Sequence, residues 1–240
     1  MTKTDKKRSR LNVISKRRLF FEFLSIFMAV ISAFALNNWN DYRKDTLAEK
    51  KILDEINNGL SKDIYDLKLN VTGHHTCMRA CKIWNKIVQG EPYKGDSLED
   101  HYGNLTRDFI NVQNIAGYAA LKSRGLELVR NDKLREEIIS LYEYDYNTLR
   151  KFEEEYREMQ FHDSYFKTLN DILAPSFEFS SSGRIIGISN PLQINENERA
   201  IVRSIILRIY KNRLFVLQYY AQLEYKLKHL QNSIEFELEN

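Results

Sequence analysis

An uninterrupted apolar stretch near the start of the chain constrains its fold more than any other feature. Residues 19–36 read LFFEFLSIFMAVISAFAL and contain a single charged side chain, Glu22. At 1.5 Å per residue, a helix of this length reaches roughly 27 Å, close to the hydrocarbon thickness of a bilayer, about 30 Å. We therefore predict a transmembrane helix over residues 19–39.

Residues at the two ends of this segment suit membrane interfaces. Trp39 supplies an indole of the kind that lies between lipid and water, and Asn37 and Asn38 could hydrogen-bond to a neighbouring helix. Glu22 follows Arg18 by one helical turn, so its carboxylate can reach that guanidinium or headgroup water. In a second interpretation Glu22 is an intramembrane acid that pairs with a partner helix. The candidate membrane or partner site therefore consists of Glu22, Asn37, Asn38 and Trp39.

Basic residues are concentrated before the apolar segment. Residues 1–18 hold eight Lys or Arg and one Asp, a net charge of +7, whereas the rest of the chain holds 28 bases and 32 acids, a net charge of −4. The positive-inside rule predicts a cytoplasmic N-terminus and an outer domain across the membrane. The basic tail is expected to contact anionic headgroups; no nucleic-acid partner is predicted, since nucleic-acid binding would need basic residues on a folded surface.

Two alternatives to a retained anchor stay open. Residues 33–35 read Ala-Phe-Ala, which matches the small-x-small pattern before a signal-peptide cleavage site. The apolar run is longer than a usual signal core, and the polar Asn-Asn-Trp edge favours an anchor. A soluble protein with a buried N-terminal helix would leave the basic flank unexplained.

The remaining chain, residues 40–240, has the composition of a single all-α domain. Only 3 Pro and 9 Gly occur in 240 residues, and period-two alternation is rare, so long helices are favoured over sheets. An apolar stripe predicts one face of a long, coiled-coil-like helix that continues from the membrane segment and ends at the turn formers of residues 89–96. The stripe consists of Leu53, Ile56, Leu60, Ile64, Leu67, Val71, His74, Met78, Cys81, Trp84 and Val88.

Further helices are predicted beyond this turn, whereas residues 97–112 show no clear pattern. Short helices are expected over residues 114–123 and 126–130, followed by a third long helix, capped by Asn131 or Asp132 and longer than about 40 residues. A last helix begins near Glu196. The inward face of the third helix includes Leu149, Phe152 and Tyr156, and that of the last includes Ile201, Ile205, Ile209, Phe215, Leu223, Leu227, Leu230 and Ile234. Together these helices predict an up-down bundle.

An irregular stretch, residues 175–195, separates the last two long helices. It is rich in Ser and Gly and is predicted to contain a brief extended pair at residues 177–179 and 184–188. Such a long loop in a bundle often has a functional role.

A cluster of potential metal ligands lies on the first outer helix. His74, Cys77 and Cys81 are spaced i, i+3 and i+7, which places them on one helical face, and imidazole and thiolate donors favour Zn or Cu(I). The same residues coincide with the apolar stripe, where Cys and Met are ordinary core residues. Core packing, a disulfide and a metal site are therefore three open interpretations.

Two stretches resemble a known group of proteins. The segment FFEFLSIFMAVISAFALNNWNDYRKDTLAEKKILDEI, with Asn38-Trp39, Asp41 and Arg43, and the segment GYAALKSRGLELVRNDKLREEIISLY are similar to a family of uncharacterised bacterial single-pass inner-membrane proteins, a domain of unknown function. The resemblance implies an anchored helical domain that faces the periplasm. It supplies no activity, cofactor or catalytic residue.

These features favour a non-enzymatic interaction protein of the bacterial inner membrane. Its expected partners are the lipid bilayer and another membrane protein or a second copy of the chain, and no cofactor is predicted. One alternative is a periplasmic ligand-sensing bundle that signals through a partner. Another is a metal-binding protein that uses the cluster of His74, Cys77 and Cys81.

Overall fold

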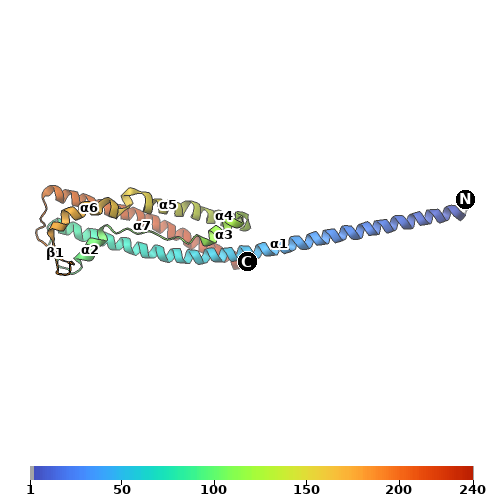
Figure 1. The fold of residues 1–240 in the computed structure, drawn as a ribbon, viewed down its shortest axis with the longest axis horizontal. Helices are drawn as coiled ribbons and strands as arrows, with labels where there is room; N and C mark the ends of the chain where they lie inside the picture. The colour runs from blue at the N-terminus through green and yellow to red at the C-terminus, as the bar shows by residue number, and fades with distance from the viewer. Residues whose placement is uncertain (1–2, 240) are drawn as a thin grey trace. The chain divides into compact units, whose positions relative to one another are not determined.

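The computed structural model describes residues 3–239, with side chains from residue 18 onward. It confirms the all-α fold (Figure 1). The α-helices are α1 (Lys3–Val88), α2 (Leu98–Leu105), α3 (Ala116–Arg124), α4 (Asp132–Ile139), α5 (Tyr146–Arg150), α6 (Phe161–Leu173) and α7 (Glu196–Glu239). Two π-helices, η2 (Ser140–Asp145) and η3 (Lys151–Glu155), join them, with 3₁₀ turns η1 (Leu126–Leu128), η4 (Arg157–Met159) and η5 (Ala174–Ser176).

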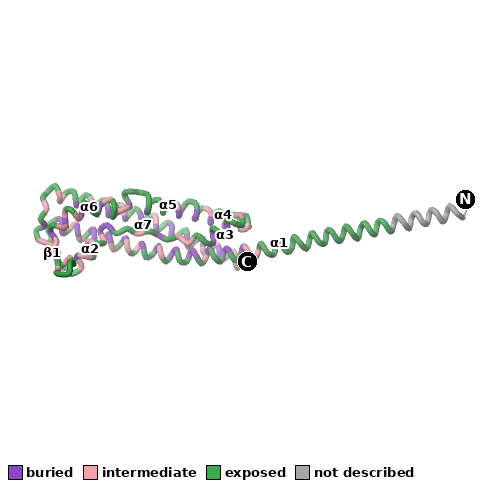
Figure 2. Tube along the Cα trace, viewed as in Figure 1, coloured by how far each residue is buried: buried purple, intermediate pink, exposed green. Residues whose placement is uncertain are grey.

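The chain divides into two compact units, Met1–Lys51 and Ile52–Asn240. In the first unit α1 contains the predicted membrane segment, and every described side chain from residue 18 to residue 45 is exposed (Figure 2). An 18-residue window there has a mean hydropathy of 2.3 and none of it is buried. By length and composition this helix could therefore cross a membrane. The side chains of the predicted basic tail before Arg18 lie outside the described residues.

The second unit is a bundle in which α7 runs antiparallel to its neighbours (Figure 1). Asn57 of α1 hydrogen-bonds to Glu235, whereas Lys68 lies 4.0 Å from Glu224, so the two helices run in opposite directions. Asn131 before α4 likewise bonds to Glu237 at the other end of the chain. The connection from α1 back to α4 includes an extended segment, residues 106–115, which we call the strap.

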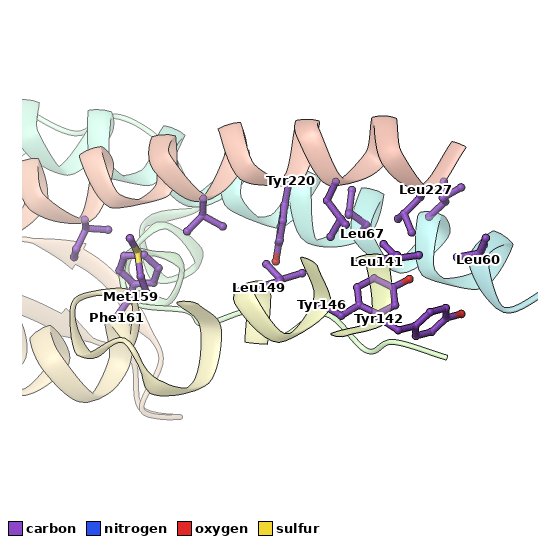
Figure 3. Close-up of a cluster of buried hydrophobic side chains, with 14 of the residues drawn as sticks. Leu60, Leu67, Leu141, Tyr142, Tyr146, Leu149, Met159, Phe161, Tyr220 and Leu227 are labelled. Carbon is purple, nitrogen blue, oxygen red and sulfur yellow. The ribbon is translucent and has the colours of Figure 1, made fainter. Parts of the chain in front are cut away.

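The buried stripe of α1 agrees with the sequence prediction (Figures 2 and 3). Leu53, Leu60 and Leu67 are at most 1% exposed and belong to the same core cluster as Leu141 of η2 and Leu227 of α7. Only Val71 of the predicted stripe is half-buried rather than buried. At the distal end of α1, the ring of Trp84 contacts Tyr102 and Phe177.

The strap explains why residues 97–112 lack a periodic pattern. Within this range, Leu98–Leu105 forms α2, and the residues from 106 onward belong to the strap, which is extended along α1. The short helix predicted from residue 114 begins at Ala116, because Asn114 belongs to the strap and binds Asp63 of α1 through its main-chain N–H, 2.8 Å. Gly125 ends α3 with a φ of 106°, a backbone angle that residues other than glycine rarely adopt. The second predicted helix, 126–130, is only the 3₁₀ turn η1.

The prediction of a third helix longer than about 40 residues is wrong. Asn131 does cap α4, since its side chain accepts the Leu134 N–H, but the helical run ends at Tyr156, whose φ and ψ are −80° and 103°. The chain restarts as α6 because the Asp108 carboxylate of the strap accepts the N–H groups of Phe161 and His162 at 2.7 and 3.2 Å. The strap thus divides the predicted helix in two.

The π-helices change which residues face the core. Each turn of η2 and η3 contains more residues than a turn of an α-helix, so different side chains point toward the core. Glu153 is therefore buried, whereas the predicted inward residues Phe152 and Tyr156 are half-buried and exposed. Leu149 is buried as predicted.

The last helix begins at Glu196, as predicted, but its first half is rotated relative to the predicted face. Ile201 and Phe215 are exposed and Ile205 is half-buried, whereas the next residues along, Val202, Ile206 and Val216, are buried. From Ile209 onward, the other predicted positions are buried as expected. The hairpin β1 (Phe177–Phe179) and β2 (Ile185–Ile188) is antiparallel and confirms the predicted extended pair.

Candidate functional site

The most unusual feature of the bundle is a set of buried polar side chains around the strap. Buried polar groups are normally hydrogen-bonded, and an unpaired one is costly. The set consists of Asp63, Asn70 and His74 of α1, Thr106 and Asn111 of the strap, Asp145 and Glu153 of the π-helices, and Arg213 of α7.

Asp63 forms the first centre of this polar core. Its carboxylate accepts the Asn114 main-chain N–H at 2.8 Å, the Asn114 amide at 2.5 Å and the Tyr146 hydroxyl at 2.5 Å. Burial raises the pKa of Asp63, while the hydrogen bonds from Asn114 and Tyr146 act in the opposite direction. The neighbouring Asp66 accepts the N–H of Val112 and the amide of Asn111, both at 2.9 Å. These two carboxylates therefore hold the strap against α1.

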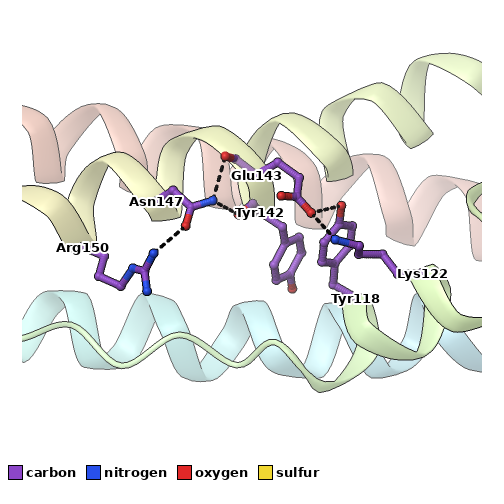
Figure 4. Close-up of polar contacts among 6 residues, drawn as sticks. All are labelled: Tyr118, Lys122, Tyr142, Glu143, Asn147 and Arg150. Atoms are coloured by element: carbon purple, nitrogen blue, oxygen red, sulfur yellow. Dashed lines mark hydrogen bonds and ion pairs between the residues drawn. The ribbon is translucent and has the colours of Figure 1, made fainter.

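A smaller polar group is formed by residues of α3, η2 and α5 (Figure 4). The Glu143 carboxylate accepts the Tyr118 hydroxyl and the Lys122 ammonium, each at 2.8 Å. The rings of Tyr118 and Tyr142 stack with centroids 4.5 Å apart. The Asn147 amide donates to the Glu143 carbonyl at 2.8 Å. The bonds of Tyr118 and Lys122 to Glu143 attach α3 to η2.

Glu153 is the second centre. One oxygen accepts the Asn111 N–H at 2.9 Å, and the other accepts the Tyr220 hydroxyl of α7. Burial is the main reason why the pKa of Glu153 is raised to about 7. A nearby carboxylate, Asp145, is also buried and is paired with Lys226 at 2.6 Å. The raised pKa allows Glu153 to change its protonation near neutral pH.

His74 and Arg213 form the third centre. An Arg213 guanidinium nitrogen lies 3.0 Å from His74 Nδ1, and another donates to the carbonyls of Leu105 and Arg107 at 3.3 and 2.8 Å. The guanidinium also lies 4.0 Å from the centroid of the Phe161 ring. Burial, followed by the charge of Arg213, lowers the pKa of His74 to about 3. The imidazole is therefore neutral and accepts a hydrogen bond from the cation.

The predicted metal cluster is not formed. His74, Cys77 and Cys81 lie on one face of α1 as predicted, yet within the described residues no group of three His, Cys, Asp or Glu side chains could hold a metal ion. The partner of His74 is a cation, Arg213, which would repel a metal ion at that nitrogen. Both cysteines are free and buried, and burial raises the pKa of Cys81 to about 12. Both thiols belong to the core, which agrees with the core-packing interpretation.

The predicted membrane residues are all exposed on the first part of α1. Glu22 pairs with Arg18 at 3.0 Å, as the first interpretation of Glu22 expects. The Asn37 amide donates to Asp41 at 3.0 Å. Trp39 is 61% exposed, and the Arg43 guanidinium lies 6.0 Å from its ring centroid. These contacts are local to the helix, so the partner role of these residues stays a prediction.

Comparison of the chain with protein-family models, with curated proteins and with solved structures gave no match. The resemblance to a family of bacterial inner-membrane proteins therefore stays a prediction.

Sequence reasoning did not identify Arg213 or Glu153 as core residues. A signal for Arg213 was present, because Val202, Ile206, Ile209, Arg213, Val216 and Tyr220 are spaced alternately by four and three residues. That heptad spacing places Arg213 on the buried seam. Glu153 had no such signal, since its position depends on the π-helices.

Proposed function

We propose that the protein is a non-enzymatic interaction protein of the bacterial inner membrane, with a cytoplasmic N-terminus and a periplasmic helical bundle. The observation that carries this proposal is the fully exposed apolar window of α1, with a mean hydropathy of 2.3. Exposed apolar surface of this extent needs lipid or protein to cover it. The eight bases before it support the orientation.

The polar core supports a structural role for the bundle. Asp63, Asp66 and Glu153 accept main-chain N–H groups of the strap, and Asp108 accepts those at the start of α6. Carboxylates used in this way stabilise the backbone. They leave the bundle as a rigid body that can present a surface to a partner.

A membrane protein, or a second copy of this chain, is the expected partner. Asn37 and Asn38 lie at the edge of the apolar segment, where amide side chains can hydrogen-bond to another helix. Apolar side chains are also exposed on the bundle, including Tyr65 and Leu69 of α1 and Val112 of the strap, each more than half exposed. Their outward position offers a partner apolar contact area.

Site-specific photo-crosslinking in native membranes tests the proposal. A photoreactive amino acid is placed at Asn38, and in a second protein at Tyr65, with Tyr225 of α7, which is 73% exposed, as the control position. A discrete adduct from Asn38 or Tyr65, but not from Tyr225, would support an interaction protein, and mass spectrometry would identify a partner or a second copy. Absence of adducts at both test positions would contradict the proposal.

The orientation is tested separately. Alkaline phosphatase and green fluorescent protein are fused after Asn240 in two separate fusion proteins. We expect phosphatase activity without fluorescence, because the phosphatase becomes active in the periplasm, whereas green fluorescent protein becomes fluorescent in the cytoplasm. The reverse result would show that the bundle lies in the cytoplasm.

A further inference from the structure

A groove lies between α1 and α7 on the surface of the bundle. Its volume is about 640 Å³, within the range of roughly 300–1,000 Å³ that is typical of small-molecule sites. Its floor is apolar and is made by Cys81 and Ile206, while Leu207, which is 58% exposed, lines the groove nearer the solvent. Cys81 and Ile206 are at most 3% exposed, so the floor is continuous with the core. Neither the polar core nor the proposed membrane anchor accounts for this groove.

Two cations line the groove, one from each helix: Lys82 of α1 and Arg203 of α7. Both are exposed, and neither forms an ion pair with an acidic side chain among residues 18–239. Basic residues nearby on the same helices are paired, since Lys86 lies 3.7 Å from Glu91 and Arg199 lies 3.3 Å from Glu196. The cations at the groove are therefore available to an external anion.

Neutral polar groups accompany these cations. The Lys82 ammonium lies 5.8 Å from the ring centroid of Tyr210, a residue of the opposite wall. Ser204 and Asn85 also line the groove and can donate hydrogen bonds. Cations, hydroxyls and amides on the wall of an apolar groove match a ligand with one anionic end and one apolar end.

A third cation lies behind the floor. Arg213 is 0% exposed, interacts electrostatically with Cys81 and hydrogen-bonds only to neutral acceptors. Asp108 acts on this cation through space, but its hydrogen bonds go to the start of α6. A buried charge is screened less than a surface charge. Arg213 therefore adds to the positive potential at the groove.

We propose that this groove binds a single-chain amphiphile with an anionic head group, such as a fatty acid or a lysophospholipid. The head group lies between Lys82 and Arg203, and the acyl chain lies on the floor of Cys81 and Ile206 with the exposed Leu207 beside it. The volume suits one small molecule rather than a protein segment. The proposal does not depend on a protein partner, so it can fail or succeed independently of the proposed function.

The test uses the full-length protein in nanodiscs of uncharged phosphatidylcholine. A palmitic acid that carries a diazirine near its methyl end is added and photolysed, and labelled peptides are mapped by mass spectrometry. We expect labels on peptides that contain Cys81 and Leu207. The double variant K82E/R203E should lose these labels by about tenfold, since opposite charge at the head group is replaced by like charge.

Two variants control for charge and for folding. K62E/K211E makes the same charge change on exposed lysines of the same two helices, outside the groove, and should label like wild type. A200W adds bulk at an exposed residue of the groove wall. It should reduce labelling although the charge of the groove is unchanged. Far-UV circular dichroism of each variant should match that of the wild type. Equal labelling of K82E/R203E and K62E/K211E would overturn the proposal.

Different head groups identify the ligand class. The carboxylate probe and a phosphate-headed lysophospholipid probe with the same chain should both label the groove, and the stronger label identifies the preferred head group. An uncharged alcohol with the same chain should label it about tenfold less. Equal labelling by the alcohol, labels confined to residues 19–36, or displacement of the probe by an acidic peptide but not by unlabelled palmitate would each overturn the proposal.

Discussion

Glu153 couples the strap, α7 and the protonation state of the core. Its two oxygens accept the Asn111 N–H and the Tyr220 hydroxyl, and its pKa is raised to about 7 by burial. A carboxyl group with a raised pKa in the folded state stabilises the fold below its unfolded pKa, and this stabilisation is lost as the pH rises through the folded pKa. The relevant interval runs from the ordinary Glu value of 4.5 to about 7.

The variant E153Q tests this coupling without an ionisable group, because the Gln oxygen can accept the Asn111 N–H and its amide N–H can donate to the Tyr220 hydroxyl oxygen. Relative to E153Q, the wild-type bundle, residues 40–240, should lose about 2–3 kcal/mol of unfolding free energy between pH 5 and pH 8. Urea unfolding followed by circular dichroism at each pH measures the difference. The titration of His74, whose pKa is lowered, is common to both proteins and cancels. A constant difference across this range would show that Glu153 does not titrate there.

Arg213 is expected to be the most sensitive basic residue of the bundle. Replacing it with Met leaves the buried carbonyls of Leu105 and Arg107 without their donor, which should lower the unfolding free energy by about 3 kcal/mol. The matched control is R208M, since Arg208 lies on the same helix, is exposed and has a 3.5 Å contact with Glu158. That control should cost less than about 1 kcal/mol. Similar losses for the two variants would contradict the structural role of Arg213.

At the scale of elements, helical periodicity predicted the buried faces of α1 and of the second half of α7, but not that of the first half of α7 and not the strap. In α1 the positions Leu60, Asp63, Leu67, Asn70 and His74 follow the heptad spacing and are all buried. A search for apolar residues alone selects Ile64 in place of Asp63, and Val71 in place of Asn70. Whether a polar residue can occupy such a seam depends on partners far along the chain, and the spacing within one helix carries no information about them.

The strap itself could not be predicted from local pattern. Its extended conformation has no internal hydrogen-bond ladder, and its N–H groups are satisfied by carboxylates of α1 and η3. The metal interpretation, one of the three left open, finds no support for a related reason, because the spacing of His74, Cys77 and Cys81 on one helix gave no sign that Arg213 contacts His74. Tertiary contacts, not residue types, decided both outcomes.

Removing the Asp63 carboxylate should detach the strap. D63A removes the acceptor of three hydrogen bonds, two from Asn114 and one from Tyr146, so amide exchange at residues 111–115 should accelerate at least about tenfold. The unfolding free energy should fall by about 2–4 kcal/mol. D54A is the control, because Asp54 is an exposed residue of the same helix. Unchanged exchange in D63A would show that other contacts hold the strap.

At the scale of the whole molecule, the chain combines an exposed apolar helix with a bundle that has its own core. The first unit, Met1–Lys51, has no buried side chain between residues 18 and 45, whereas the second unit, Ile52–Asn240, contains the hydrophobic core. The sequence predicted a boundary after residue 39, from the length and hydropathy of the apolar segment, whereas the two compact units divide after Lys51. Covering the first unit therefore requires something other than the core of this bundle.

Charges placed in the centre of the apolar segment should release the protein from membranes. In F27K/I31K two lysines replace exposed apolar side chains one helical turn apart, and each should cost about 3 kcal/mol of insertion. L47K places a lysine at another exposed apolar residue, beyond the segment, and should leave the protein in the membrane. Carbonate extraction and centrifugation measure the retained fraction. Since neither change touches a buried side chain, the bundle should keep its circular dichroism. Retention of F27K/I31K would mean that the segment is covered by protein rather than lipid.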